Sequence, residues 1–157
     1  VFKGPALNDA VIARGNLARL NELEIKVNKD VLTHLRADGM IFSTPTGSTA
    51  YSLAAGGPVV HPSLQCMTIT PVAPHALSVR PIVLPPDSNV ETVLLTDAKK
   101  GDVTLTLDGQ KGFELKLNDR VLIKADKNKS IQLITHPRRS FYKILRTKFQ
   151  FGRKAAK

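Results

Sequence analysis

Residues 43–57 read STPTGSTAYSLAAGG, and this stretch determines how the rest of the sequence is interpreted. The apolar residues 40–42 before it predict a strand, and the hydroxyl-rich residues 44–49 predict a turn. The helix-tolerant residues that follow predict a short helix. Ser48 or Thr49 is expected to cap its N-terminus, and the pair Gly56-Gly57 followed by Pro58 is expected to end it. The stretch therefore predicts a strand, a turn and a short helix in succession.

Such a turn can hold a ligand or only begin a helix. The unpaired N–H groups and positive dipole at a helix N-terminus favour phosphate or ribose oxygens. Tyr51 falls in the first helical turn, where its ring could stack on a base. Hydroxyl clusters at this position also occur where they only cap the helix, and the residues alone leave both interpretations open. The stretch is not a P-loop, because it has no Gly-Lys-Ser/Thr ending.

The remaining pattern is mainly that of short strands. Residues 23–27 and 31–36 alternate in polarity around a tight turn at 28–30, which predicts a β-hairpin with His34 on its polar side. Prolines punctuate residues 71–86 and predict loops or sheet edges there. Further strands are expected at residues 10–14, 67–71, 90–95, 103–107, 113–117, 121–125 and 131–134. This close spacing favours an all-β sandwich over βαβ units.

The C-terminal residues predict a separate helix. Ser140 is a candidate N-cap, and the apolar residues Phe141, Ile144, Leu145 and Phe149 follow at helical spacing. We therefore divide the sequence into a β domain, residues 1–137, and a basic helix and tail, residues 138–157. The fold class is mainly β, a β-sandwich with a short helix after residues 43–48 and a helix near the C-terminus.

Composition limits the possible partners. The 157 residues are 42% hydrophobic, which argues for a folded domain, and a net charge of +10 favours an anionic partner. The basic residues gather near the C-terminus, where a solvated tail is favoured over a nucleic-acid patch. Aromatic residues make up 5% of the sequence and tryptophan is absent, so little material exists for stacking single-stranded bases. No apolar run approaches the roughly 20 residues of a membrane span. We therefore expect neither nucleic acid nor membrane as a partner.

The single cysteine, Cys66, allows no disulfide within the chain and no cysteine metal cluster, which fits a reducing compartment such as the cytoplasm. Its apolar surroundings predict a buried structural thiol. The sequence has no initiating Met and no signal peptide at its start. We expect it to be part of a longer protein.

Three blocks of this sequence resemble a known family. Residues 44–51, TPTGSTAY, followed by Ala-Gly-Gly-Pro at 55–58, are similar to the signature of the NAD kinase family. Residues 70–81, TPVAPHALSVRP, resemble the next family motif. Asn8 and Asp9 resemble the family's Asn-Glu pair, with the shorter Asp in place of Glu. The blocks stand in the family's order and spacing, and the resemblance covers nearly the whole chain.

The resemblance implies a set of dinucleotide contacts. Asn8 and Asp9 would contact the adenosine half of NAD, and Asp38 would approach its nicotinamide riboside end. A simple Asp-Gly turn explains Asp38 equally well. Many relatives carry Ser at the position of Ala54, so this chain lacks one hydroxyl contact. The full set of implied NAD-binding residues is Asn8, Asp9, Asp38, Thr46, Thr49, Ala50, Tyr51, Ser52, Ala54, Ala73 and Asp108.

The last two of these residues have their own context. The resemblance places Ala73 near the ligand of a neighbouring subunit, and therefore implies a homodimer or homotetramer with shared sites. Asp108 stands in an Asp-Gly pair that predicts a hairpin turn. In the family, the matching turn comes close to the bound dinucleotide.

The resemblance also implies a reaction. NAD kinases transfer a phosphoryl group from ATP, or sometimes polyphosphate, to the 2′-hydroxyl of the adenosine ribose of NAD, giving NADP, with a divalent metal such as Mg²⁺. The family places its key aspartate in an N-terminal Gly-Gly-Asp-Gly motif, and nothing in this sequence matches it. The chain is therefore interpreted as the C-terminal substrate-binding domain, with no catalytic residue of its own and little or no activity alone.

Two other functions are compatible with parts of the sequence. A lipid kinase of the diacylglycerol or sphingosine type would share a distant version of the fold. A non-enzymatic basic binding module would account for the charge alone. The block at residues 44–51 together with Asn8 and Asp9 favours the NAD kinase family over both.

Overall fold

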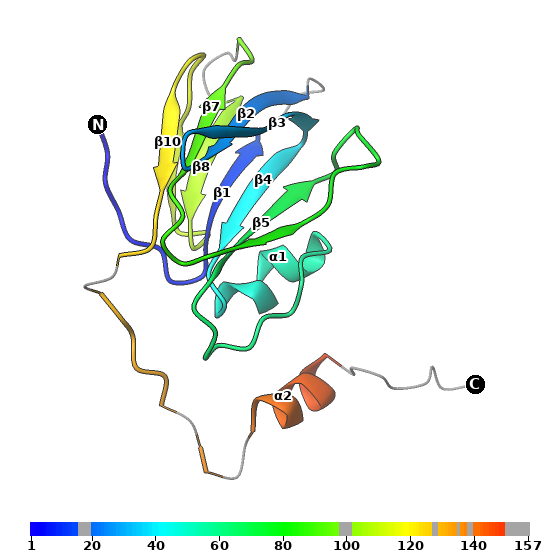
Figure 1. Ribbon diagram of the computed structural model, residues 1–157, viewed down its shortest axis with the longest axis vertical. Coiled ribbons are helices and arrows are strands. Elements are labelled where there is room, and N and C mark those ends of the chain that lie inside the picture. The colour runs from blue at the N-terminus through cyan, green and yellow to red at the C-terminus, as the bar shows by residue number, and fades with distance from the viewer. Residues whose placement is uncertain (16–19, 98–101, 127–128, 135, 138–139, 150–157) are drawn as a thin grey trace. The chain divides into compact units, whose positions relative to one another are not determined.

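The computed structural model describes residues 1–15, 20–97, 102–126, 129–134, 136–137 and 140–149. The chain forms two units, residues 1–125 and residues 126–157, and each is described by itself. Unit 1 holds every strand that the structure describes (Figure 1).

Unit 1 contains a six-stranded antiparallel sheet that carries the residues of interest. Its central strand β1 (Asp9–Arg14) pairs on one side with β4 (Gly39–Ser43) and on the other with β8 (Val103–Leu107). The outer strands are β5 (Met67–Val72) and β6 (Ile82–Leu84) beyond β4, and β9 (Lys111–Glu114) beyond β8.

A second, four-stranded antiparallel sheet completes this unit, in the order β10-β7-β2-β3. Its strands are β2 (Asn21–Val27), β3 (Asp30–Ala37), β7 (Val90–Leu94) and β10 (Arg120–Ile123). The predicted hairpin is confirmed, and Asn28 and Lys29 take positive φ in its turn, as a two-residue hairpin requires. His34 lies on the polar side as predicted, and its ring is 3.1 Å from the Glu24 carboxylate.

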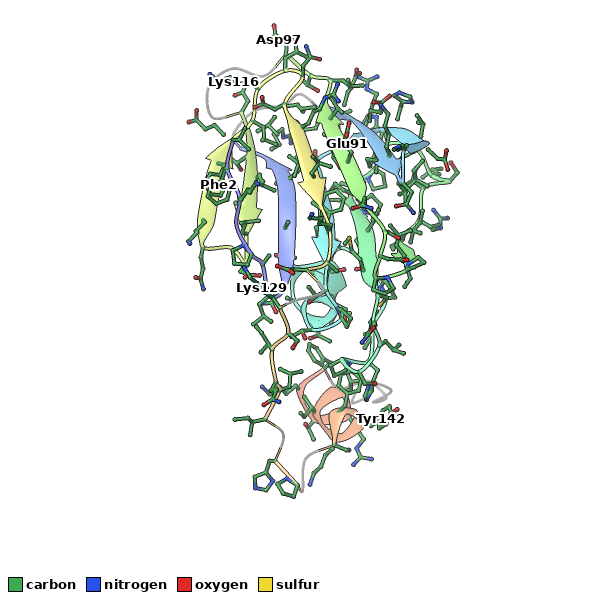
Figure 2. All side chains as sticks on the ribbon, turned by 60° about the vertical axis from the view of Figure 1, so that its left-hand side comes forward. Phe2, Glu91, Asp97, Lys116, Lys129 and Tyr142 are labelled. Atoms are coloured by element: carbon green, nitrogen blue, oxygen red, sulfur yellow. The ribbon has the colours of Figure 1, made fainter. Side chains whose placement is uncertain are left out.

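The two sheets enclose one hydrophobic core. Alternate residues of each strand face it, because successive side chains of a strand point to opposite faces. Both sheets contribute, among others Ala10, Ile12, Leu23, Ile25, Leu35, Met40, Phe42, Ile69, Val90, Leu94, Val103 and Leu107. At the N-terminus, the Phe2 ring stacks on Phe113 of β9 with centroids 3.7 Å apart (Figure 2). The predicted fold class, a mainly β sandwich, is confirmed.

The stretch after β4 forms a 3₁₀ turn, η1 (Gly47–Thr49), and a single helical turn, α1 (Tyr51–Ala54), at the end of that strand (Figure 1). The predicted cap is wrong: the N-cap position of α1 is Ala50, and no side chain caps it. The predicted stop is confirmed, because Gly56 follows the C-cap residue Ala55 and adopts a φ of +83°.

Unit 2 contains α2 (Phe141–Lys148). The predicted cap is confirmed here, since the Ser140 hydroxyl accepts the N–H of Lys143 at 3.2 Å. The strand predicted at 131–134 is wrong, because these residues lie outside every strand that the structure describes. Alternation predicts an extended backbone, but a strand also needs a partner edge.

Candidate nucleotide site

The sheet topology brings the sequence blocks to one edge of the six-stranded sheet. Asp9 begins β1 and pairs with Ser43 at the end of β4. On the other side, Ala10 pairs with Leu107 at the end of β8, and Asp108 follows directly. Because both neighbours run antiparallel to β1, their ends lie beside its start. Asn8 and Asp9, the stretch at 43–57 and Asp108 therefore share this edge, which we call the nucleotide edge.

Asp9 is a buried carboxylate with no bonding partner among the residues that the structure describes. Its exposed fraction is 6%. Ala10 and Ile12 face the core, so Asp9 lies on the opposite face of the sheet. Burial and, to a smaller extent, the nearby charge of Asp108 raise the pKa of Asp9 above its ordinary value. A ligand that donates hydrogen bonds to this largely buried carboxylate would stabilise its ionised form.

Asp108 occupies the turn between β8 and β9. It adopts a φ of +50°, followed by Gly109 at +65°, and the predicted Asp-Gly hairpin turn is confirmed. Its carboxylate accepts the backbone N–H groups of Leu7 (2.8 Å), Asn8 (2.6 Å) and Asp9 (3.1 Å). Partial burial raises the pKa of Asp108, but the three backbone hydrogen bonds together outweigh it, so that the pKa lies below its ordinary value.

Thr44 binds the same segment from the other side. Its hydroxyl donates to the carbonyl of Leu7 at 2.6 Å and accepts the N–H of Gly47 at 3.1 Å. Its own N–H donates to the carbonyl of Asn8 at 2.9 Å. Thr44 stands in the family block at residues 44–51, but the sequence pattern predicts no role for it. Its hydrogen bonds cross between segments distant in sequence, and no local pattern indicates them.

Gly47 brings the turn into backbone contact with Asn8. A β-carbon at this position would lie 2.0 Å from the Asn8 carbonyl oxygen, so only glycine fits. The hydroxyl of Ser48, which is fully buried, accepts the N–H of Val60 at 3.0 Å. These contacts hold the turn against the start of β1.

The predicted ligand contacts in the turn and α1 have different exposures. Thr46 and Thr49 are half-buried, and the Thr49 hydroxyl donates to the Thr46 carbonyl at 3.3 Å. Ala50 is exposed, and Tyr51 is 48% exposed, so its ring is accessible for stacking. These four residues share one short, solvent-accessible segment beside the nucleotide edge.

Ser52 and Ala54 are placed differently. Ser52 is fully buried, and its hydroxyl lies 3.0 Å from that of Thr70 on β5. Gly57 packs on this pair, since a β-carbon there would lie 2.2 Å from the Ser52 oxygen. Ala54 is exposed. The geometry gives Ser52 a bond that holds α1 against the sheet.

Asp38 and Ala73 lie at the opposite edge of the six-stranded sheet. Asp38 precedes β4, and its carboxylate is 3.4 Å from Arg14 at the far end of β1. Its N–H donates to the Val72 carbonyl at 3.0 Å, and Ala73 follows with a φ of +45°. The length of β1 separates the two edges by about 16 Å. One chain therefore does not bring Asp38 and Ala73 together with Asn8 and Asp9.

The described part of the chain contains no group of three metal-ligating side chains. Cys66, predicted to be buried, is partly exposed, and its partial burial raises the pKa of the thiol. Among the described helices, none is long and apolar enough to cross a membrane.

The chain is similar to curated NAD kinases. An NAD kinase of Geobacter sulfurreducens is 51% identical over 146 residues, covering 93% of this chain and 50% of that protein. One from Geobacter metallireducens is 47% identical over 152 residues, covering 97% of this chain and 53% of the relative. The chain thus spans about half the length of the curated relatives it matches.

Solved structures agree with the sequence relatives. The yeast NADH kinase complexed with NADH superposes with a TM-score of 0.88 at 32% identity, over 96% of this chain and 43% of that one. An Archaeoglobus fulgidus NAD kinase in complex with ATP superposes at 0.69 with 28% identity, over 78% of this chain and 46% of that one. The model of the ATP-NAD kinase C-terminal domain matches residues 7–135. These matches show that the chain belongs to the ATP-NAD kinase C-terminal domain family.

Proposed function

We propose that this chain is the dinucleotide-binding part of an NAD kinase. In the longer protein, ATP or polyphosphate would phosphorylate the 2′-hydroxyl of the adenosine ribose of NAD, giving NADP. The observation that carries the proposal is the buried, unpartnered carboxylate of Asp9 at the edge where the family block begins. Family membership and the likeness to a kinase complexed with NADH support it.

The residues of the nucleotide edge would share the binding of the adenosine half. Asn8 offers an amide and Asp9 a carboxylate, which suit a ribose diol or an exocyclic amine. Thr49 and Ala50 would line the dinucleotide, with Thr46 as a further polar contact. Tyr51 would offer its exposed ring to a base.

Asp38 and Ala73 would serve a second copy of the chain. They lie at the far edge of the sheet from Asn8, so they would reach the nicotinamide end of a dinucleotide bound by a neighbour. This division supports a homodimer or homotetramer with shared sites. The same arrangement would account for the predicted NAD contacts lying at two opposite edges of the sheet in a single chain.

The phosphoryl transfer itself would depend on the rest of the longer protein. The 2′-hydroxyl oxygen bonds to the γ-phosphorus, the bond to ADP breaks, and the hydroxyl proton passes to a base. The resemblance places the accepting carboxylate outside this chain. A divalent metal such as Mg²⁺ would enter as its complex with ATP. The single cysteine fits a reducing compartment, and the cytoplasm is such a compartment that also contains NAD. We therefore propose a cytoplasmic location.

The test measures NADP formation and NAD affinity in the longer protein. We expect NADP to form with NAD and Mg–ATP, and Asp9→Ala to raise the dissociation constant of NAD about tenfold, for about 1.4 kcal/mol of lost binding. Asp119→Ala, in the connection between β9 and β10, is the matched control. Unchanged affinity in folded Asp9→Ala would remove Asp9 from the site.

Other outcomes would separate the alternative functions. The 157-residue chain alone is expected to form little or no NADP, and activity comparable to that of the longer protein would contradict this. Binding to lipid vesicles without NAD binding would favour a lipid kinase. Binding to DNA or RNA that weakens steeply with salt would favour a basic binding module.

A further inference from the structure

The segment Leu7 to Asp9 carries the two residues that would hold adenosine, and its backbone is bonded from both sides. All three of its N–H groups donate to the Asp108 carboxylate. The carbonyl groups of Leu7 and Asn8 accept from Thr44, and that of Asp9 accepts the N–H of Asp108 at 2.9 Å. Thr44 after β4 and Asp108 after β8 therefore form hydrogen bonds with every backbone N–H and carbonyl group of this segment.

The charge of Asp108 is more than its turn requires. A two-residue hairpin turn accepts Asn-Gly as readily as Asp-Gly. An asparagine, however, has one acceptor oxygen, whereas Asp108 uses both of its oxygens, Oδ2 for Leu7 and Oδ1 for Asn8 and Asp9. The carboxylate also stands close enough to Asp9 to disfavour the ionised form of that residue. The turn alone therefore does not account for a carboxylate at this position.

Thr44 has a matching function on the carbonyl side. Its hydroxyl is a donor to Leu7 and an acceptor for Gly47, so it joins the start of β1 to the family turn. A valine has the same shape, but its side chain can neither donate nor accept a hydrogen bond. A serine keeps both.

We propose that Thr44 and Asp108 are positioning residues. Together they form a two-sided clamp that holds the Leu7–Asp9 backbone in place and so orients the side chains of Asn8 and Asp9 toward the dinucleotide. This inference rests on the proposed function for its ligand, but the clamp itself is defined without one. Three of about four acceptor positions of the Asp108 carboxylate are already occupied by backbone N–H groups. Asp108 therefore acts through Asn8 and Asp9 and not as a principal ligand contact.

The experiment compares variants of the longer protein in two measurements. The first is amide hydrogen exchange of Leu7, Asn8 and Asp9 by NMR, without ligand. The second is steady-state kinetics with NAD and Mg–ATP. The test variants are Thr44→Val and Asp108→Asn, with Thr44→Ser as the conservative variant.

Two matched controls remove similar bonds elsewhere. Thr96→Val removes a hydroxyl that accepts the N–H of Glu22 at 2.6 Å, and Asp119→Asn changes a carboxylate that accepts the N–H of Lys116 at 2.8 Å. Both controls are expected to leave the exchange of the Leu7–Asp9 amides and the KM for NAD unchanged.

We expect both test variants to speed amide exchange at Leu7–Asp9 at least tenfold. They should raise the KM for NAD about tenfold and leave the KM for ATP within twofold, and Thr44→Ser should restore both values. Unchanged exchange in folded Asp108→Asn would overturn the clamp. Faster exchange with an unchanged KM for NAD would overturn its positioning role. Absence of NADP formation by the parent would refute the proposed function instead, while the exchange data would still decide the clamp.

Discussion

Gly47 lies against the backbone of Asn8 so closely that a β-carbon would come within 2.0 Å of the Asn8 carbonyl oxygen. This contact joins the family turn to the start of the central strand. Gly47→Ala should therefore displace one of the two segments. We expect it to cost about 1–3 kcal/mol of unfolding free energy, as overpacking does, and to weaken NAD binding. Chemical denaturation and NAD titration measure the two effects.

Gly112 provides the control for this substitution. The nearest atom to a β-carbon there would be 3.9 Å away, which is an ordinary contact. Gly112→Ala should change the unfolding free energy by less than about 0.5 kcal/mol and leave NAD binding unchanged. Equal effects of the two substitutions would contradict the special role of Gly47.

Asp9→Asn should stabilise the protein while weakening the binding of NAD. The pKa of Asp9 is raised in the folded state, so ionisation of this carboxyl opposes folding. The stability difference should be absent below the ordinary pKa of about 3.9 and should grow as pH rises through the raised pKa. At neutral pH we expect a gain of about 0.5–2 kcal/mol. Thermal unfolding of both proteins across pH 3–8 tests this.

Asp108→Asn should have the opposite effect on stability. Its pKa is lowered in the folded state, so the ionised carboxylate favours folding. That contribution is present above the ordinary pKa and is lost as pH falls through the lowered pKa. The variant should therefore be less stable than the parent at pH 7 and approach it in acid. A gain in stability at pH 7 would contradict the hydrogen bonds to Leu7, Asn8 and Asp9.

Ser52→Ala should act on stability more than on binding. Its hydroxyl is fully buried and lies 3.0 Å from that of Thr70, so removing it leaves Thr70 without this partner. We expect a loss of about 1–3 kcal/mol in unfolding free energy. The double variant Ser52→Ala/Thr70→Val should lose less than the sum of the single variants. A tenfold loss of NAD affinity in folded Ser52→Ala would instead support a ligand contact.

Tyr51→Ala should act on binding more than on stability. The side chain is 48% exposed, so its loss should change the unfolding free energy by less than about 0.5 kcal/mol. If the ring stacks on a base, the dissociation constant of NAD should rise about 5- to 150-fold, for about 1–3 kcal/mol of stacking. Tyr51→Phe keeps the ring and should bind like the parent. Equal losses in both variants would point to the hydroxyl.

Local patterns were sufficient to predict most of the fold. Alternation gave the position of the hairpin, and the apolar runs predicted β4, β5, β7 and β8 to within about two residues. The short strand β6 lies at a sheet edge between Pro81 and Pro85, within the segment predicted to form loops or sheet edges, but the flanking prolines left open which of the two it would be. The strand predicted at 131–134 failed because alternation does not reveal whether a partner edge exists.

Prediction of the site depended on long-range contacts. The caps predicted at Ser48 and Thr49 are wrong, since both hydroxyls bond to carbonyl groups of the turn itself. The hydroxyl that joins the blocks belongs to Thr44, and its partner Leu7 lies in a segment that no local rule connects to it. The division of the contacts between two edges follows from strand register, which the sequence did not provide.

The length of β1 is fixed from both ends. Asp9 stands at one end and Arg14, beside Asp38, stands at the other, and both flanking strands are paired with the residues between them. Inserting or deleting one residue within β1 would point the Asp9 side chain toward the core, or would shift Arg14 away from Asp38. Natural homologues should therefore vary in length in the hairpin loops, while the interval from Asp9 to Arg14 stays constant.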